Sequence, residues 1–300
     1  MYATKVRDRV YLLDTFALGQ QKTVGVYVIT GPRVALVDCG YASSYLNVLT
    51  GLSEIGIAPS DVRYVIPTHV HLDHAGATGQ LLREMPNAEV LAHERGVPHL
   101  VDPSRLIESA TRVFGEVIMG LYGPPLPVPS ERITPVGKET SLDLGGGLTA
   151  LMMHTPGHAP HQISLLLDNV KMILTADAVG ILYPDLKALI PTTPPPSFDP
   201  DQLVSSVAAL ERTNPEGLLL PHYGVNFEVS RVFKETREKV PAWVREVREM
   251  KKDGMGLDEI AEAMEARVKN EANASDLPIY AKVSVRSSVM GILHYLSKNA

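Results

Sequence analysis

The chain has 300 residues, of which 45% are hydrophobic and 21% are charged, and its formal net charge at pH 7 is −6. This is the composition of a folded globular protein long enough for one large domain or two ordinary ones. The acidic balance argues against a broad basic surface, so we expect neither nucleic acid nor a membrane as a partner.

The expected compartment follows from what the chain lacks. Its N-terminus has no uninterrupted apolar segment typical of a signal peptide, and no apolar run reaches the roughly 18 residues needed to span a bilayer. The single cysteine, Cys39, cannot form an internal disulfide. We therefore expect a cytoplasmic protein.

The first part of the chain alternates short β-rich runs with runs of helical period. The expected strands cover residues 6–15, 23–30, 33–40, 62–69 and 88–93. The expected helices cover residues 43–56, 77–86 and 105–122, and a proline-rich loop follows at 123–131. This alternation predicts a mixed α/β domain.

The remainder of the chain changes character near residue 230. Before it, strands are expected at residues 148–158, 162–169, 171–178 and 217–224, with one helix at 201–213. After it the pattern is helical only, over residues 229–252, 256–270 and 280–299. We therefore predict a mixed α/β domain at 1–230 and a helical subdomain at 231–300, with a lid or a dimer contact as its candidate roles.

One short segment concentrates side chains that bind metals. Residues 67–79 read PTHVHLDHAGATG and place His69, His71, Asp73 and His74 on the connection between a strand and a helix. Imidazole and carboxylate groups together suit Zn, Fe or Mn. The alternative is a polar turn whose histidines only cap the helix.

Further candidates follow later strands. The segment looks divided between two ions, which predicts more histidine and aspartate ligands at other strand ends. His158, Asp177 and His222 each come directly after an apolar run of strand character. Such positions can converge on one edge of a sheet.

The motifs THVHLDHAG, TPGH, TAD and PHYG, together with the earlier VDCG, occur in the order and spacing of a known family. The chain resembles the metallo-β-lactamase-fold hydrolases over about residues 1–230. The resemblance implies an α/β (α+β) fold, a four-layered αββα sandwich with two metal ions at one edge of its sheets, extended here by the C-terminal helices.

The resemblance also assigns roles to residues. It implies that His69, His71 and His158 hold the first ion, that Asp73, His74 and His222 hold the second, that Asp177 bridges the two and that Asp38 orients a ligand histidine. We expect two divalent ions, with zinc favoured and iron or manganese as alternatives.

Two adjacent ions can share a hydroxide that attacks an ester, thioester, lactone, amide or phosphodiester. Asp73 is placed to pass a proton to the leaving group. His71 stands where flavodiiron-type members carry Glu, which argues against oxygen or nitric oxide reduction. The presence of Asp73 and the position of Cys39 argue against the lactamase branches. The acidic balance and modest length do not favour the nuclease branches.

The branch that remains is the glyoxalase-II-like group of thioesterases, lactonases and related esterases. The chain resembles glyoxalase II and a quinolone-signalling thioesterase in layout, since both also carry C-terminal helices. We expect a dinuclear hydrolase that cleaves a small-molecule thioester or ester. The alternatives are a lactonase of the acyl-homoserine-lactone type, a phosphodi- or phosphotriesterase, and a non-catalytic metal-containing signalling or binding protein, with a homodimer as an open alternative. Tyr183, Tyr223 and His161 are candidates for substrate contact, each with a packing role as the alternative.

Overall fold

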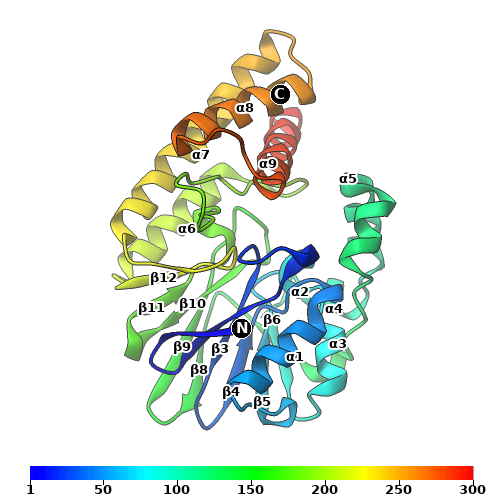
Figure 1. Ribbon diagram of the computed structural model, residues 1–300, viewed down its shortest axis with the longest axis vertical. Helices are drawn as coiled ribbons and strands as arrows, with labels where there is room; N and C mark the ends of the chain where they lie inside the picture. Colours follow the sequence, from blue (N-terminus) through cyan, green and yellow to red (C-terminus); the bar gives the residue numbers. More distant parts are fainter. Residues whose placement is uncertain (300) are drawn as a thin grey trace.

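The computed structural model describes residues 1–299, and its strands form two sheets with helices on both outer surfaces (Figure 1). The first sheet has seven strands in chain order: β1 (Ala3–Arg7), β2 (Val10–Asp14), β3 (Gly25–Ile29), β4 (Val34–Val37), β5 (Val62–Ile66), β6 (Glu89–His93) and β7 (Ile133–Val136). Neighbours are antiparallel up to β4 and parallel from β4 to β7.

The second sheet has six strands in the order β13-β12-β11-β10-β9-β8. Its members are β8 (Glu139–Gly145), β9 (Leu148–His154), β10 (Ile163–Leu167), β11 (Met172–Leu174), β12 (Gly217–Leu219) and β13 (Val225–Asn226). Strand β10 is antiparallel to both β9 and β11, and β11 is parallel to β12. Strands β9, β11 and β12 therefore all end at the same edge of this sheet.

The helices cover the outer faces. Those associated with the first half are α1 (Tyr45–Glu54), α2 (Leu72–Ala75), α3 (Thr78–Glu84), α4 (Val97–Val101) and α5 (Ser104–Tyr122). Those associated with the second half are α6 (Pro200–Arg212), α7 (Val229–Lys252), α8 (Leu257–Ala272) and α9 (Ile279–Lys298). In Figure 1, α7, α8 and α9 form one end of the molecule, and α5 projects beyond the sheets on the other side. None of the helices in residues 1–299 is long and apolar enough to cross a membrane.

The alternation of side chains along the strands produces the layers. In β3, Val26 and Val28 pack into the cluster shared with α1 and α3, whereas Tyr27 and Ile29 point into the cluster between the two sheets. Because successive strand residues face opposite ways, an apolar residue at every position indicates burial on both faces. The four-layered αββα sandwich expected from the sequence is confirmed.

A third apolar cluster covers the outer face of the second sheet. It joins Leu218 of β12 and Val207 of α6 to residues of every C-terminal helix, among them Val240, Ile260 and Ile292. The C-terminal helices thus extend the outer layer of the sandwich. The boundary at residue 230, as a division between domains, stays a prediction.

The clearest differences from the expected elements lie in three places. The strand expected at residues 6–15 is a hairpin of β1 and β2, turned at Asp8 and at Arg9, which has a φ of 58°. Strands β7 and β8 were not expected, since their outward positions are mostly polar and exposed. The helix expected at 105–122 is present as α5 but is interrupted at Gly115, whose φ is 81°.

Candidate metal centre

The strand ends of both sheets meet at one edge of the sandwich. The first sheet supplies Asp38 after β4 and residues 69–74 after β5, which we call the histidine segment. The second sheet supplies His158 after β9, Asp177 after β11 and His222 after β12, on what we call the second-sheet loops. A hydrogen bond of 2.8 Å from the Ile163 N–H to the Thr68 carbonyl joins the sheets at this edge.

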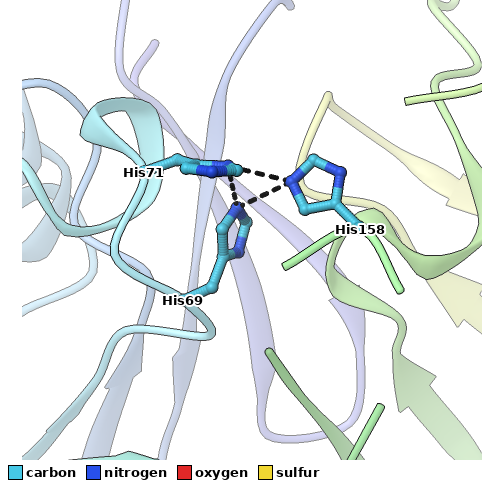
Figure 2. A group of neighbouring side chains, drawn as sticks. All are labelled: His69, His71 and His158. Atoms are coloured by element: carbon cyan, nitrogen blue, oxygen red, sulfur yellow. Dashed lines mark hydrogen bonds between the residues drawn. The ribbon is translucent and has the colours of Figure 1, made fainter. Parts of the chain in front are cut away.

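Three histidines from the two sheets point at a common centre (Figure 2). The Nδ1 atom of His71 lies 2.9 Å from the Nε2 atoms of both His69 and His158, and these two Nε2 atoms are 3.2 Å apart. Nitrogens bound tetrahedrally to zinc, with bonds of about 2.0–2.1 Å, lie about 3.3 Å from one another. This triangle of nitrogens therefore has nearly the size of one face of a tetrahedral zinc site.

A second group lies beside the first. The ligand atoms of Asp73, His74 and His222 all lie within 4.8 Å of one another. Asp177 lies between the groups: its Oδ1 is 3.5 Å from His74 Nε2 and 3.4 Å from His222 Nε2. Its Oδ2 is 3.4 Å from His158 Nε2. The two oxygens of one carboxylate therefore face different ligand groups.

Main-chain carbonyls fix the rings of the second-sheet histidines. The Nδ1 of His158 donates to the carbonyl of Thr192 at 3.0 Å, and the Nδ1 of His222 faces the carbonyl of Thr23 at 3.3 Å. Since a carbonyl only accepts, each Nδ1 carries the proton and each neutral ring has its lone pair on Nε2. In both residues Nε2 is the atom that faces the centre.

A buried carboxylate performs the same task in the histidine segment. Asp38 Oδ2 accepts from His74 Nδ1 at 2.9 Å, and Asp38 Oδ1 accepts from the Thr68 N–H at 2.8 Å. Asp38 is only 3% exposed, so both contacts are shielded from water. The aspartate thereby orients His74 and the start of the histidine segment together.

The electrostatics of the centre suit a cation. Burial and the nearby histidines lower the pKa of His69, and burial together with His158 lowers that of His71 to about 3. Neutral imidazoles have the free lone pairs that a metal requires. Although burial opposes it, the surrounding carboxylates, above all Asp73, raise the pKa of His74 to about 10. A bound divalent ion would balance the same negative charge.

Two buried atoms of the centre have no hydrogen-bond partner within residues 1–299. These are His74 Nε2 and Asp177 Oδ1, which face each other. An unpaired buried polar atom is costly, and native structures rarely contain one without a bound ion or water. The nitrogen triangle, the fixed tautomers and these unpaired atoms together fit a pair of divalent metals.

The backbone is strained next to the ligands. Asp38, Ala176 and Tyr223 have φ angles of 63°, 48° and 79°, all in the left-handed region. Ala176 directly precedes Asp177, and Tyr223 directly follows His222. Non-glycine residues adopt this region at a cost of about 1–2 kcal/mol each, so the surrounding fold must hold them there.

The candidates for substrate contact occupy different surroundings. The Tyr183 ring lies 6.3 Å from that of His222, and its hydroxyl bonds to Ser284 Oγ of α9 at 3.0 Å. His161 is buried 6.2 Å from the His71 ring, and burial lowers its pKa to about 2. Tyr223 packs at the edge of the cluster between the sheets, with its hydroxyl beside Thr4. Substrate contact stays a prediction for all three.

Sequence motifs did not indicate the groups that hold the ligand rings. Thr192 and Thr23 contribute carbonyl oxygens, which every residue type has, so no pattern could identify them. Thr68 holds Asp38 through its main-chain N–H in the same way. Of these supporting residues only Asp38 gave a signal in the sequence, and Thr68, whose hydroxyl also lies 3.2 Å from His69 Nδ1, gave none.

Comparison with known proteins gives the family of this fold and centre. A family model described as the metallo-beta-lactamase superfamily matches residues 20–222. A metallo-beta-lactamase fold-containing protein of Sulfurisphaera tokodaii is 30% identical over 174 residues, 57% of this chain and 61% of the relative. An N-acyl homoserine lactonase of Rhizobium radiobacter is 32% identical over 134 residues, 44% of this chain and 46% of the relative. The chain thus matches less than two thirds of the length of these relatives.

Among solved structures, a metallo-beta-lactamase family protein of Thermus thermophilus superposes with a TM-score of 0.71. The match covers 97% of this chain and 94% of the other at 20% identity, which shows a shared fold that includes the C-terminal helices. With its motifs, its sandwich and more than half of its length matched, the chain belongs to the metallo-beta-lactamase superfamily.

Proposed function

We propose that this protein is a dinuclear metal-dependent hydrolase that cleaves a carboxylic thioester or ester, cyclic esters included. In this proposal the first ion is held by His69, His71 and His158, the second by Asp73, His74 and His222, and Asp177 is shared. The position of Asp177 carries the proposal, because its two oxygens face the two ligand groups at 3.4–3.5 Å.

When bound, a pair of divalent ions supplies Lewis acidity and lowers the pKa of water towards neutrality. The side chains of this chain position the reactants. Thr192 and Thr23 keep the His158 and His222 rings in the tautomer with a free Nε2. In this proposal Asp73, whose side chain is 21% exposed, passes a proton to the leaving group.

Neighbouring groups favour an uncharged carbonyl substrate. Burial raises the pKa of Tyr183, so its phenol, whose hydroxyl bonds to Ser284 Oγ, stays neutral beside His222. Burial also keeps His161 neutral. The two ligand groups are formed by histidine and aspartate. A neutral phenol and a neutral imidazole beside them suit an acyl group.

The cyclic ester is a specific candidate because of one relative. As its name states, the N-acyl homoserine lactonase of Rhizobium radiobacter acts on a lactone, and the match to this relative covers 134 residues. We therefore include acyl homoserine lactones among the substrates to be tested. A homodimer and a cytoplasmic location stay predictions.

The test combines metal analysis with a panel of substrates. The purified protein should contain about two divalent ions per chain and should hydrolyse a member of a panel of glutathione and coenzyme A thioesters, lactones and phosphoesters. The Asp177→Ala variant should lose bound metal and lose hydrolysis more than about a hundredfold, since even the partners of metal ligands contribute ten- to hundredfold.

Other results of this test would contradict the proposal or indicate a different function. Full activity of Asp177→Ala would contradict the shared carboxylate. Turnover of phosphoesters alone would identify a phosphodi- or phosphotriesterase. A protein that binds two ions and hydrolyses no member of the panel would be a metal-containing signalling or binding protein instead.

A further inference from the structure

Helix α9 is bonded to the segment that follows the ligand Asp177. Ser288, in the middle of α9, is 2% exposed. Its hydroxyl donates to the Pro191 carbonyl at 2.6 Å and accepts from the Thr193 N–H at 3.4 Å. In return the Thr193 hydroxyl donates to the Ser288 carbonyl at 2.9 Å. Residues 191–193 are therefore fixed to α9 by buried hydrogen bonds on both sides of Thr192.

Thr192 connects this segment to two candidate ligands. Its carbonyl accepts the Nδ1–H of His158 at 3.0 Å, and its hydroxyl donates to the Asp177 carbonyl at 2.9 Å. A shift of residues 191–193 would therefore change the ring orientation of His158 and the backbone position of Asp177. These two residues face each other across the centre at 3.4 Å.

Close packing makes the contact with α9 sensitive to small changes. Gly291 lies one helical turn beyond Ser288, and a Cβ atom at this position would lie only 1.7 Å from the Thr193 carbonyl oxygen. Only glycine permits this approach of helix and segment. Gly291 thereby sets the distance at which the Ser288 hydrogen bonds form.

We propose that α9 is a positioning element of the metal centre, in which Ser288 and Gly291 hold residues 191–193 so that Thr192 orients His158 and Asp177 for the first ion. The role of the C-terminal helices then includes metal retention, in addition to any role as lid or dimer contact. This inference depends on the proposed ligand set and not on the reaction that the centre catalyses.

The loss of the hydrogen-bond partners of Ser288 explains why its substitution should weaken metal binding. The Ser288→Ala change leaves the Pro191 carbonyl and the Thr193 N–H unpaired in the interior, and the segment between them must move to find other partners. Loss of a group that orients a ligand histidine lowers metal affinity about ten- to hundredfold. We expect a loss in this range for Zn²⁺ at the site that contains His158.

The test measures Zn²⁺ affinity of the full-length protein by competition with a chromogenic chelator. Ser288→Ala is compared with Ser287→Ala, which removes the hydroxyl of the partly exposed neighbour on the same helix. The absorption spectrum of the Co²⁺-substituted proteins reports ligand geometry, and thermal unfolding of the metal-free proteins reports the stability of the fold. Weaker Zn²⁺ binding and an altered Co²⁺ spectrum in Ser288→Ala alone would support the proposal.

Equal Zn²⁺ affinity and equal Co²⁺ spectra for Ser288→Ala and Ser287→Ala would overturn the proposal, even if Ser288→Ala were less stable. If Ser288→Ala does not fold, Thr193 variants provide the test: Thr193→Val removes the hydroxyl that donates to the Ser288 carbonyl of α9, whereas Thr193→Ser keeps it. Weak binding by Val and near-normal binding by Ser would support the proposal, and equal affinities would overturn it. Because metal affinity is measured without a substrate, these outcomes are independent of the hydrolysis panel.

Discussion

The two halves of the candidate metal centre are held in different ways. In the histidine segment, one buried side chain, Asp38, orients His74 and also binds the backbone of Thr68. In the second-sheet loops, main-chain carbonyls of Thr192 and Thr23 orient His158 and His222. The supports of both halves come from distant parts of the chain, so the difference lies in the supporting group: a side chain in the first half and main-chain carbonyls in the second.

This difference indicates which substitutions should disturb the orientation of the ligands in each half. A side-chain support can be removed by one substitution at the supporting residue. A carbonyl support cannot be removed in this way, because every residue supplies a carbonyl, and it is lost only when its segment moves. The second-sheet loops should therefore be sensitive to packing changes, and the histidine segment to the chemistry of Asp38.

The largest expected effects come from removing one ligand in each half. His71→Ala and His222→Ala should each reduce bound metal from about two ions to about one per chain, and hydrolysis should fall more than about a hundredfold. Elemental analysis after dialysis checks the first expectation, and the substrate panel checks the second. Loss of both ions from either variant would show that the two halves bind metal only as one unit.

The next effect isolates the side-chain support. Asp38→Ala should lower metal affinity about ten- to hundredfold by freeing the His74 ring. Asp38→Asn should lose less, because its oxygen can still accept one hydrogen bond and because asparagine tolerates the φ of 63° at this position. A chelator competition assay measures both. Equal affinities of the Asn and Ala variants would contradict the importance of these contacts.

A smaller effect tests the packing of the second-sheet loops. Gly157 and Gly224 both have φ angles near glycine-only values, 128° and 112°, but only Gly157 is crowded, since a Cβ atom there would lie 2.2 Å from the Leu203 nitrogen. Substitution by alanine should cost about 1–3 kcal/mol of unfolding free energy, with Gly157 at the upper end. Denaturant unfolding measures this. A larger cost at Gly224 would contradict the packing argument.

The smallest expected effect concerns a contact between the sheets. The rings of His93 on β6 and His154 on β9 stack with centroids 4.0 Å apart. Burial, with the proximity of His154, lowers the pKa of His93 from 6.5 to about 4. The unfolded chain therefore takes up this proton at higher pH than the folded chain, so stability is lost as the pH falls from 6.5 to 4.

The His93→Asn variant checks this contribution. On acidification from pH 7 to pH 5, its melting temperature should fall less than that of the wild type by about 2–4 °C, which corresponds to roughly 1 kcal/mol. Protonation of the metal ligands affects both proteins and cancels in the difference. Equal acid sensitivity of the two proteins would assign the loss to groups other than His93.

Much of the fold followed from apolar patterns, and the exceptions have physical causes. The strands β3, β4 and β6 are buried at almost every position and β5 at Val62, Val65 and Ile66, and their apolar runs indicated them clearly. Strand β8 alternates exposed polar residues with partly buried ones, so its apolar signal is weak. The hairpin of β1 and β2 turns at Arg9, a residue type without turn preference, and the pattern gave no break there.

In the candidate centre, too, some residues could be predicted from the sequence and others could not. The motifs identified side chains that the structure brings together from both sheets, since ligand chemistry depends on residue type. The contacts of Ser288 with residues 191–193 could not be expected, because a serine in an amphipathic helix has no distinctive pattern. The residues that carry the chemistry were thus visible in the sequence, and most of those that place them were not.

The left-handed backbone at Asp38, Ala176 and Tyr223 has a consequence for transplanting this centre. An unfolded chain or a short peptide rarely adopts these conformations at non-glycine residues. The same ligand side chains grafted on another scaffold would keep the ligand atoms but would lack these three left-handed residues, and with them the geometry that presents the ligands. Metal retention therefore serves as a reporter of the intact fold, since the ligand arrangement exists only where the whole sandwich imposes it.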